Sequence, residues 1–148
     1  MNKVYIMRSG SGGGKSFWIK QNLIDPIICS ADNFFMKEGK YQFDPKQLGQ
    51  AHAKCFKDFI NALMVFKDNP EATIVVDNTN ISESELSPYV LAANAFNWPW
   101  EIIYIKANVE KAVSGNQHGV PEKKVREMFE RLDKIKLRYP QTEVNGNV

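Results

Sequence analysis

The hydrophobic positions of the chain form short apolar runs, separated by longer segments in which apolar residues recur every three or four positions. The runs are rich in β-branched and aromatic residues, which is typical of buried strands. They cover residues 3–7, 26–30, 72–77 and 100–106. The run "ATIVVD" (72–77) is apolar up to its terminal aspartate, as expected of a central parallel strand covered on both faces.

The segments between these runs predict helices. Asp44-Pro45-Lys46-Gln47 combines an N-cap acid, a proline at the first helical position and a glutamine at the capping-box position. The apolar stripe of the helix that follows consists of Leu48, Ala51, Cys55, Phe59, Leu63 and Phe66. Further helices are predicted over 16–24, 87–96 and 121–138. The stretch 34–43 has no clear period and predicts a loop or flap with exposed aromatic side chains.

Strands that alternate with helices predict an α/β sandwich with a central parallel sheet. A chain of 148 residues is long enough for one domain with a proper core. We predict that this domain covers 1–140 and that the polar tail 141–148 frays. A hydrophobic content of 43% with 24% charged residues is ordinary for a soluble globular protein, and the net charge of +2 provides no strong field for nucleic acids.

Cysteine content and apolar run length bear on the compartment. Cys29 and Cys55 both lie in apolar stretches, and no Cys-x-x-Cys spacing occurs. Two thiols do not make a disulfide framework, which indicates a reducing compartment. The apolar runs are shorter than the about 20 residues that span a bilayer, and the first residues do not match a secretory signal. These features predict a cytoplasmic protein with no membrane partner.

The glycine-rich stretch "RSGSGGGKS" (8–16) lies between the first predicted strand and the first predicted helix. In that context backbone N–H groups converge beside the positive end of a helix, and glycines let the chain wrap around phosphate oxygens. Lys15 can reach the terminal phosphates and the Ser16 hydroxyl can bind Mg²⁺. The nucleotide-binding residues predicted here are Ser11, Gly12, Gly13, Gly14, Lys15, Ser16 and Phe17. Ser9 replaces the first glycine of the usual pattern, and the alternative is a flexible glycine turn.

Two acids follow strand ends, where parallel sheets bind ligands. Asp77 ends the run 72–77 and can bind Mg²⁺ or orient a substrate, or else cap the next element. Asp32 follows the run 26–30 and can accept the proton of an attacking hydroxyl as a general base. Its alternative is an Asx turn.

Four segments occur in the same order as in a known family: "MRSGSGGGKS", "SADNFFMKEGKYQFDPKQLGQAH", "VVDNTN" and "HGVPEKKVREMFERL". On these motifs the sequence resembles the P-loop 5′-hydroxyl polynucleotide kinases of phages and bacteria and the related NEDD4-binding-protein-2-like predicted kinases. The resemblance implies a P-loop kinase fold with a C-terminal helical lid, ATP and Mg²⁺ as cofactors, and a nucleic acid or nucleotide as acceptor.

The resemblance also implies roles for individual residues. Lys15 and Ser16 match the ligands of the ATP phosphates and of Mg²⁺, and Asp32 matches the general base. Asp77, Thr79 and Asn80 match the motif that lines the acceptor side. Gly119-Val120-Pro121 matches the end of the lid.

Two further departures from the family pattern concern lost arginines. Phe35 stands where family members grip the acceptor with an arginine, and it can stack on a base or pack inside the flap. Gly115 stands where the lid normally has an arginine that stabilises the transferring phosphoryl group. His118, Lys123 or other basic residues of the following helix are candidate substitutes. The alternative for the basic helix residues is that they form a solvent-exposed helix face with no catalytic role.

Two classes of function therefore remain open at this stage. The first is a kinase that phosphorylates a hydroxyl of a nucleic acid or nucleotide, including the variant that acts on a hydroxymethylated base in DNA. The second is a nucleotide-binding module with weakened or lost turnover. The oligomeric state is not encoded in any motif of the sequence.

Overall fold

Five parallel strands form a central sheet in the order β2-β5-β1-β6-β7. The computed structural model describes residues 1–116 and 118–147. The strands are β1 (Lys3–Arg8), β2 (Ile27–Cys29), β5 (Thr73–Val76), β6 (Trp100–Lys106) and β7 (Thr142–Asn145). The α/β fold predicted from the alternation of strands and helices is confirmed, and the four predicted strands occur where the apolar runs placed them.

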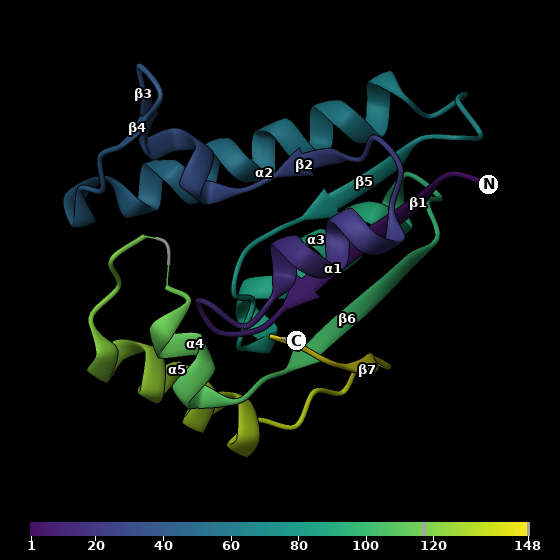
Figure 1. The fold of residues 1–148 in the computed structure, drawn as a ribbon. Coiled ribbons are helices and arrows are strands. Elements are labelled where there is room, and N and C mark those ends of the chain that lie inside the picture. Colours follow the sequence, from purple (N-terminus) through teal and green to yellow (C-terminus); the bar gives the residue numbers. More distant parts are fainter. Residues whose placement is uncertain (117, 148) are drawn as a thin grey trace.

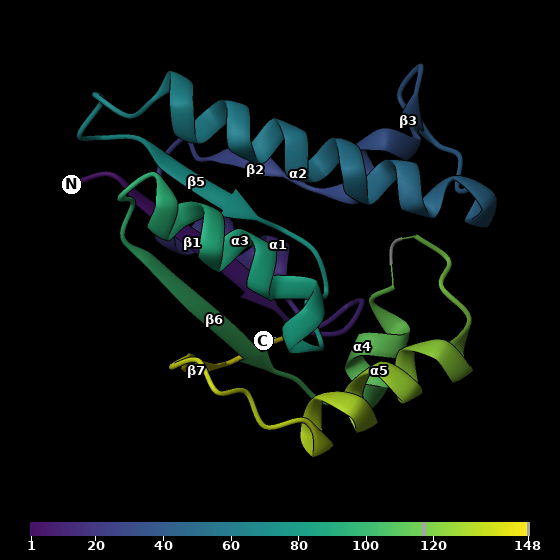
Figure 2. The same ribbon diagram turned by 180° about the vertical axis from the view of Figure 1, so that it is seen from behind.

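Helices cover both faces of this sheet (Figures 1 and 2). Helix α1 (Lys15–Asn22) lies on one face, and α2 (Leu48–Val65) and α3 (Glu83–Ala95) lie side by side on the other. Helices α4 (Val109–Ser114) and α5 (Glu122–Lys134) pack together beyond the carboxyl end of β6. Within the described residues, none of the helices combines the length and apolar character needed to cross a membrane.

The alternation of side chains along β1 divides the core between the two faces. Val4 and Ile6 pack in the cluster under α2 and α3, and Met7 packs with Ile19 of α1 on the opposite face. All four are almost fully buried, as a central parallel strand requires. Helices α4 and α5 pack in a smaller cluster around Val125 and Phe129, which also includes Ile81 and the β6 residue Tyr104, so this cluster joins the lid to the sheet.

The helices differ from the sequence prediction in several places, and α5 ends at Lys134 rather than at 138. Helix α3 begins at Glu83 rather than at Ser87-Pro88, because Ser82 and Glu85 form a complete capping box. Pro88 therefore lies inside the helix. The short helix α4, which starts at the N-cap Asn108, was not predicted. The Asp44 N-cap is confirmed, since its carboxylate accepts from the backbone N–H of Lys46 at 3.0 Å, although a 3₁₀ turn (Pro45–Gln47) precedes α2.

The flap between β2 and α2 contains more structure than a loop. A 3₁₀ helix η1 (Ala31–Phe35) leads into a hairpin of β3 (Met36–Lys37) and β4 (Lys40–Tyr41). Glu38 and Gly39 at its tip both have positive φ, 52° and 76°, as two-residue hairpin turns with matching twist require. The hairpin brings Tyr41 back toward η1, and this position matters for the site.

The prediction that the tail frays is wrong. Residues 142–145 form β7, which pairs in parallel with β6 from Ile103 to Lys106. Gly146 N–H then donates to the Lys106 carbonyl at 2.7 Å, and the Asn147 side chain exchanges two hydrogen bonds with the backbone of Asn108. A polar sequence can form this strand because β6 would otherwise leave its backbone groups unpaired at the sheet edge.

Gly146 provides a test of this docked tail. A Cβ at this position would collide with the Ile105 side chain and the Gly13 carbonyl. We therefore expect Gly146→Ala to lower the free energy of unfolding by about 1–3 kcal/mol, measured by urea denaturation. Gly49→Ala is the matched control, since a Cβ there meets nothing within 4 Å and alanine favours the helix. Equal urea midpoints for Gly146→Ala and the unmodified protein would contradict the docking of the tail.

Candidate active site

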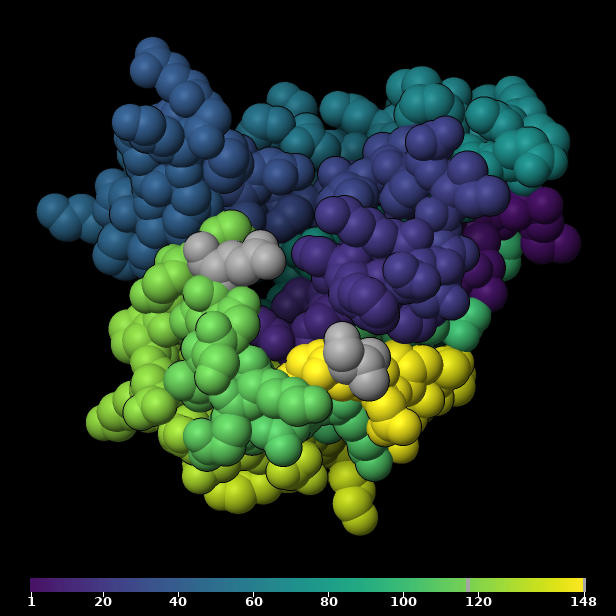
Figure 3. All heavy atoms as spheres, in the orientation of Figure 1, coloured from purple at the N-terminus to yellow at the C-terminus, as the bar shows by residue number. Residues whose placement is uncertain are grey.

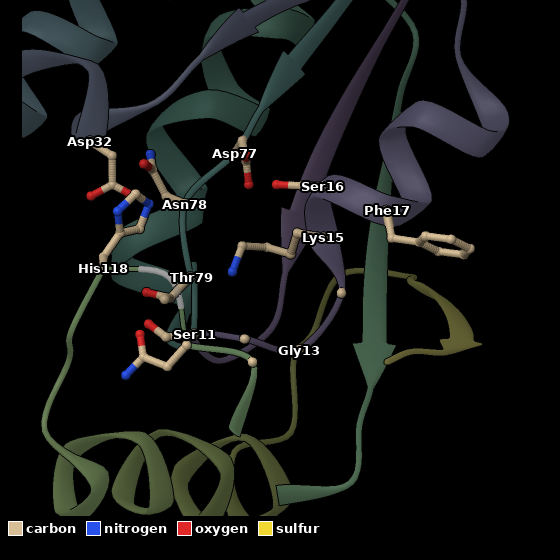
Figure 4. Close-up of a pocket in the computed structure, with 14 residues that line it drawn as sticks. Ser11, Gly13, Lys15, Ser16, Phe17, Asp32, Asp77, Asn78, Thr79 and His118 are labelled. Carbon is tan, nitrogen blue, oxygen red and sulfur yellow. The ribbon is translucent and has the colours of Figure 1, made fainter. Parts of the chain in front are cut away.

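A cavity of about 230 Å³ lies at the carboxyl ends of β1 and β5, where the molecule is visibly hollowed between the phosphate loop, the η1 segment and the lid (Figure 3). The sequence-predicted nucleotide-binding residues, 11–17, all line it, together with Asp32, Asp77 and Thr79. The remaining described lining residues are Asn78, Gly115, Asn116 and His118. The fold therefore assembles both candidate acids and the glycine loop in one place (Figure 4).

The glycine loop has a backbone shape that only glycine adopts without strain. Gly12 and Gly14 have φ of 76° and 105°, in the left-handed region that L side chains rarely occupy. A Cβ on Gly12 would also collide with the Ala112 carbonyl of α4. Gly14 is the N-cap of α1, and its carbonyl accepts from Trp18 N–H at 3.0 Å. The amino end of α1 therefore opens onto the cavity, as in phosphate-binding loops.

Ser9 fits the position where the usual pattern has a glycine. The residue is fully buried and is not among those with positive φ, so a Cβ causes no backbone strain there. Its hydroxyl donates to the Ile105 carbonyl at 2.9 Å, and its N–H donates to the Thr79 carbonyl at 3.1 Å. The serine side chain thus adds a link between the loop and β6, and the backbone N–H links the loop to the segment after β5.

Lys15 and Asp77 form the charged centre of the cavity. Burial lowers the pKa of Lys15, and the negative charges of Asp77 and Asp32 oppose this shift. Burial likewise raises the pKa of Asp77, and the positive charge of Lys15 opposes that shift. The Lys15 ammonium points into the cavity (Figure 4) and lies 3.4 Å from the Gly10 carbonyl. Each group helps to keep the other charged in a poorly solvated place.

Ser16 and Asp77 are suited to hold Mg²⁺. Their side-chain oxygens face each other across the cavity (Figure 4), and hydroxyl and carboxylate oxygens are the ligands that this hard cation prefers. No group of three or more His, Cys, Asp or Glu side chains arranged for a metal occurs in 1–116 and 118–147. Two protein oxygens with phosphates and water as the other ligands match the usual mode of Mg²⁺ binding in kinases.

Asp32 projects its carboxylate into the cavity. The turn at its position is capped by Ser30, whose hydroxyl accepts from Asp32 N–H at 3.2 Å, so the Asx-turn alternative is wrong. The Asp32 carboxylate instead accepts from the Tyr41 hydroxyl at 3.1 Å, and its other oxygen lies 3.7 Å from Nε2 of His118. Asp32 is half exposed, so an incoming hydroxyl has access to it.

Tyr41 and His118 join the two sides of the cavity. Their ring centroids are 4.2 Å apart, so the hairpin touches the lid loop directly above Asp32. The sequence does not predict a site role for Tyr41, because its segment has no hydrophobic period. The Glu38-Gly39 pair is the local signal that indicates a hairpin and therefore the return of Tyr41 toward Asp32.

Other basic residues of the lid do not reach the cavity. Lys123 is exposed and does not line it. Arg126 binds Glu110 through two hydrogen bonds, at 2.9 and 3.0 Å, and Glu122 at 3.4 Å. Among the lining residues that the structure describes, Lys15 is the only lysine or arginine. Gly115 lines the cavity but contributes no side chain.

Three predicted site residues have other roles or orientations. Phe35 is 1% exposed and packs against Phe43 and Tyr41, so the packing alternative replaces base stacking. Asn80 is 2% exposed and donates to the Met7 carbonyl at 2.8 Å, which makes it a structural link. Phe17 borders the cavity, but its ring points away from it (Figure 4).

Comparison with known proteins identifies relatives of the chain. A family model described as an AAA domain matches residues 4–140. NEDD4-binding protein 2 of Homo sapiens is 28% identical over an alignment of 139 residues, which covers 88% of this chain and 8% of that protein. The chain therefore spans less than a tenth of the length of this curated relative.

Solved structures share the fold at low sequence identity. A chain of the Pnkp1/Rnl/Hen1 RNA repair complex matches with a TM-score of 0.69 and 18% identity, over 90% of this chain and 44% of that one. A gluconokinase from Sinorhizobium meliloti 1021 matches with a TM-score of 0.59 and 9% identity, over 97% of this chain and 82% of that one. These likenesses show a P-loop kinase fold.

The family match and the geometry agree on the kind of domain. The matched range 4–140 begins at β1 and includes the phosphate loop, both acids and the lid helices. The chain belongs to the AAA domain family and is a P-loop kinase-like protein.

Proposed function

We propose that this protein transfers the γ-phosphoryl group of ATP to a hydroxyl of a nucleic acid or nucleotide, in the manner of a 5′-hydroxyl polynucleotide kinase. The observation that carries the proposal is the convergence of Lys15, Asp77 and Asp32 in one cavity beside the phosphate loop. Two observations support the choice of acceptor. One structural neighbour belongs to an RNA repair complex, and the motifs around Asp32 and Asp77 resemble those of polynucleotide kinases.

The residues divide the work of the reaction. The loop amides and Lys15 bind the phosphates of the donor. Ser16 and Asp77 would hold Mg²⁺, which when bound would neutralise charge on the phosphates. Asp32 accepts the proton of the acceptor hydroxyl as the oxygen bonds to the γ-phosphorus and the bond to ADP breaks. Catalysis comes from positioning and electrostatic stabilisation.

Tyr41 orients the base. Burial, with the nearby Asp32 charge and hydrogen bond, raises the pKa of Tyr41 to about 12, so the phenol keeps its proton at neutral pH and donates to one carboxylate oxygen. The other oxygen remains directed toward His118 and the cavity. The pair of contacts limits rotation of the Asp32 carboxylate and leaves an accepting lone pair for the substrate.

One observation favours a second candidate, a nucleotide-binding module with weak turnover. The described lining of the cavity contains no arginine, and Arg126 is engaged by two glutamates. An arginine that stabilises the transition state contributes about 10³–10⁵ in rate. The retained Lys15, Asp32 and Asp77 favour the enzyme. A kinase of a hydroxymethylated base in DNA would use the same residues with another acceptor.

The proposal is tested by transfer of radiolabelled phosphate from ATP to 5′-hydroxyl DNA and RNA oligonucleotides. We expect Asp32→Asn to lower kcat by about 10²- to 10⁴-fold, because a general base is lost, while ATP binding measured by calorimetry stays intact. Lys15→Ala should abolish ATP binding. The control is Asp58→Asn, a change of the same kind at an exposed carboxylate that pairs with Lys54. Full transfer by Asp32→Asn would refute the assigned mechanism.

Removal of the Tyr41 hydroxyl tests its orienting role. Tyr41→Phe retains the ring that packs on His118 and Phe43 but loses the hydrogen bond to Asp32. We expect kcat to fall about fivefold to tenfold, corresponding to one hydrogen bond, with the KM for ATP unchanged. Tyr139→Phe is the control, because its hydroxyl binds Ser87 away from the cavity. An unchanged kcat in Tyr41→Phe would show that Asp32 needs no such support.

Introduction of an arginine into the lid distinguishes a weakly active kinase from a nucleotide-binding module that transfers no phosphate. Gly115→Arg places a cation on the wall of the phosphate cavity, and we expect it to raise kcat at least about tenfold, a small part of what such arginines contribute. Gly115→Ala isolates the effect of the Cβ, which would lie 3.2 Å from the Lys111 carbonyl. If neither variant transfers phosphate while both bind ATP, the nucleotide-binding module is the better description.

A further inference from the structure

A second cavity, of about 580 Å³, lies between α2 and α3. These helices run side by side on the face of the sheet opposite α1 (Figure 2). The walls come from α2, from the segment 78–80 and from the first turns of α3. Its volume is within the range of about 300–1,000 Å³ that is usual for small-molecule sites, and the donor phosphates do not need it.

The two cavities share a wall. Asn78 and Thr79 line both of them. Asn78 also accepts from the Ala31 N–H at 2.9 Å through its side-chain oxygen, which fixes the residue next to Asp32. A molecule in the second cavity therefore lies next to the cavity that contains Asp32, on the other side of Asn78 and Thr79.

The charge of the second cavity excludes an anionic occupant. No lysine or arginine is present among its described lining residues. The carboxylate among its described lining residues is that of Glu85. It accepts hydrogen bonds from the backbone N–H groups of Ile81 and Ser82 at 2.7 and 3.3 Å, as part of the N-terminal cap of α3. A phosphate or a carboxylated sugar would therefore have no lysine or arginine side chain to bind there. The cavity suits a neutral group.

The apolar wall favours a flat ring. Phe56 is only partly buried, and Tyr89 packs on it with ring centroids 5.4 Å apart at 75°. Pro88 completes this side of the cavity. His52 and Ser84 are exposed at its rim and offer hydrogen-bonding groups. An aromatic wall with a few polar groups at the edge is the arrangement that recognises nucleobases in single-stranded nucleic acids.

We propose that this cavity holds the base of the acceptor nucleoside against Phe56, while the hydroxyl to be phosphorylated extends past Asn78 and Thr79 to Asp32. This inference rests on the proposed kinase function and narrows it to acceptors with a base next to the reacting hydroxyl. The phosphates of a longer chain would lie outside the cavity. Phe56, rather than Phe35, is then the aromatic residue that contacts the acceptor.

An abasic acceptor provides the direct test. Two oligonucleotides are compared, identical except that the 5′-terminal nucleoside of one is replaced by a tetrahydrofuran with the same 5′-hydroxyl. For the unmodified protein we expect the KM of the abasic oligonucleotide to be about 5- to 100-fold higher, the range that stacking of one base provides. The KM for ATP should be the same with either acceptor.

Variants assign the effect to the cavity. Phe56→Leu removes the aromatic ring but keeps apolar bulk, and we expect it to raise the KM of the intact oligonucleotide toward that of the abasic one, leaving the abasic KM unchanged. Phe96→Leu is the matched control, because Phe96 is 38% exposed and lines neither cavity. His52→Ala changes an exposed residue of the same cavity and is a second variant for the case in which Phe56→Leu does not fold. Equal KM values for the two oligonucleotides in the unmodified protein would overturn the inference while leaving the kinase proposal intact.

Binding measurements test the second cavity if the protein shows no kinase activity. If no oligonucleotide is phosphorylated, the proposed kinase function fails, and fluorescence anisotropy with the same two labelled oligonucleotides decides about the cavity. Tighter binding of the intact oligonucleotide that is lost in Phe56→Leu and kept in Phe96→Leu would support a base-binding site. Equal binding of both oligonucleotides, or none, would overturn it.

Discussion

The tight backbone conformation of the glycine loop is the constraint on which the rest of the structure depends. Ser9 fastens the start of the loop to β6 through the Ile105 carbonyl and to the segment after β5 through the Thr79 carbonyl. From other directions, Phe129 of α5 lies against Gly10, and Gly146 of the tail lies against the Gly13 carbonyl. Elements distant in sequence therefore hold the loop in its binding shape, and a loop held in advance loses less entropy when it binds.

The parts of the fold that the sequence predicts are those in which local pattern and tertiary packing agree. The buried strands have uniform apolar runs because both of their faces are covered, and the position of Lys15-Ser16 between a strand and a helix follows from that order. Asp32 and Asp77 could be placed together because carboxyl ends of parallel strands meet at one edge. These inferences need only periodicity and the rules of parallel sheets.

The remaining features arise from contacts that no local pattern encodes. The tail becomes β7 because β6 presents an unpaired edge, although its own sequence is polar. Phe35 is buried because the hairpin folds Tyr41 and Phe43 over it, and exposure of an aromatic in an aperiodic segment cannot be deduced from its neighbours in sequence. The same fold-back creates the contact between Tyr41 and Asp32. Long-range closure of a short hairpin thus accounts both for the burial of Phe35, one of the two alternatives left open, and for the missed contact of Tyr41.

The balance of charge in the site indicates where catalytic power has to come from. Lys15 is the only lysine or arginine of the described lining, and two carboxylates already act on it. Stabilisation of the transferring group therefore falls on one ammonium, on the loop amides and on the cation that Ser16 and Asp77 can hold. Because few charged groups would stabilise the transferring group, the rate of the proposed reaction would depend more strongly on the placement of the acceptor hydroxyl. Such placement can lower the activation free energy by about 7–11 kcal/mol. In the proposed kinase, the second cavity, which shares Asn78 and Thr79 with the phosphate site, would supply such placement by holding the neighbouring base. On this proposal, the described lining without an arginine and the second cavity belong to one physical arrangement, in which orientation of the acceptor compensates for limited charge stabilisation.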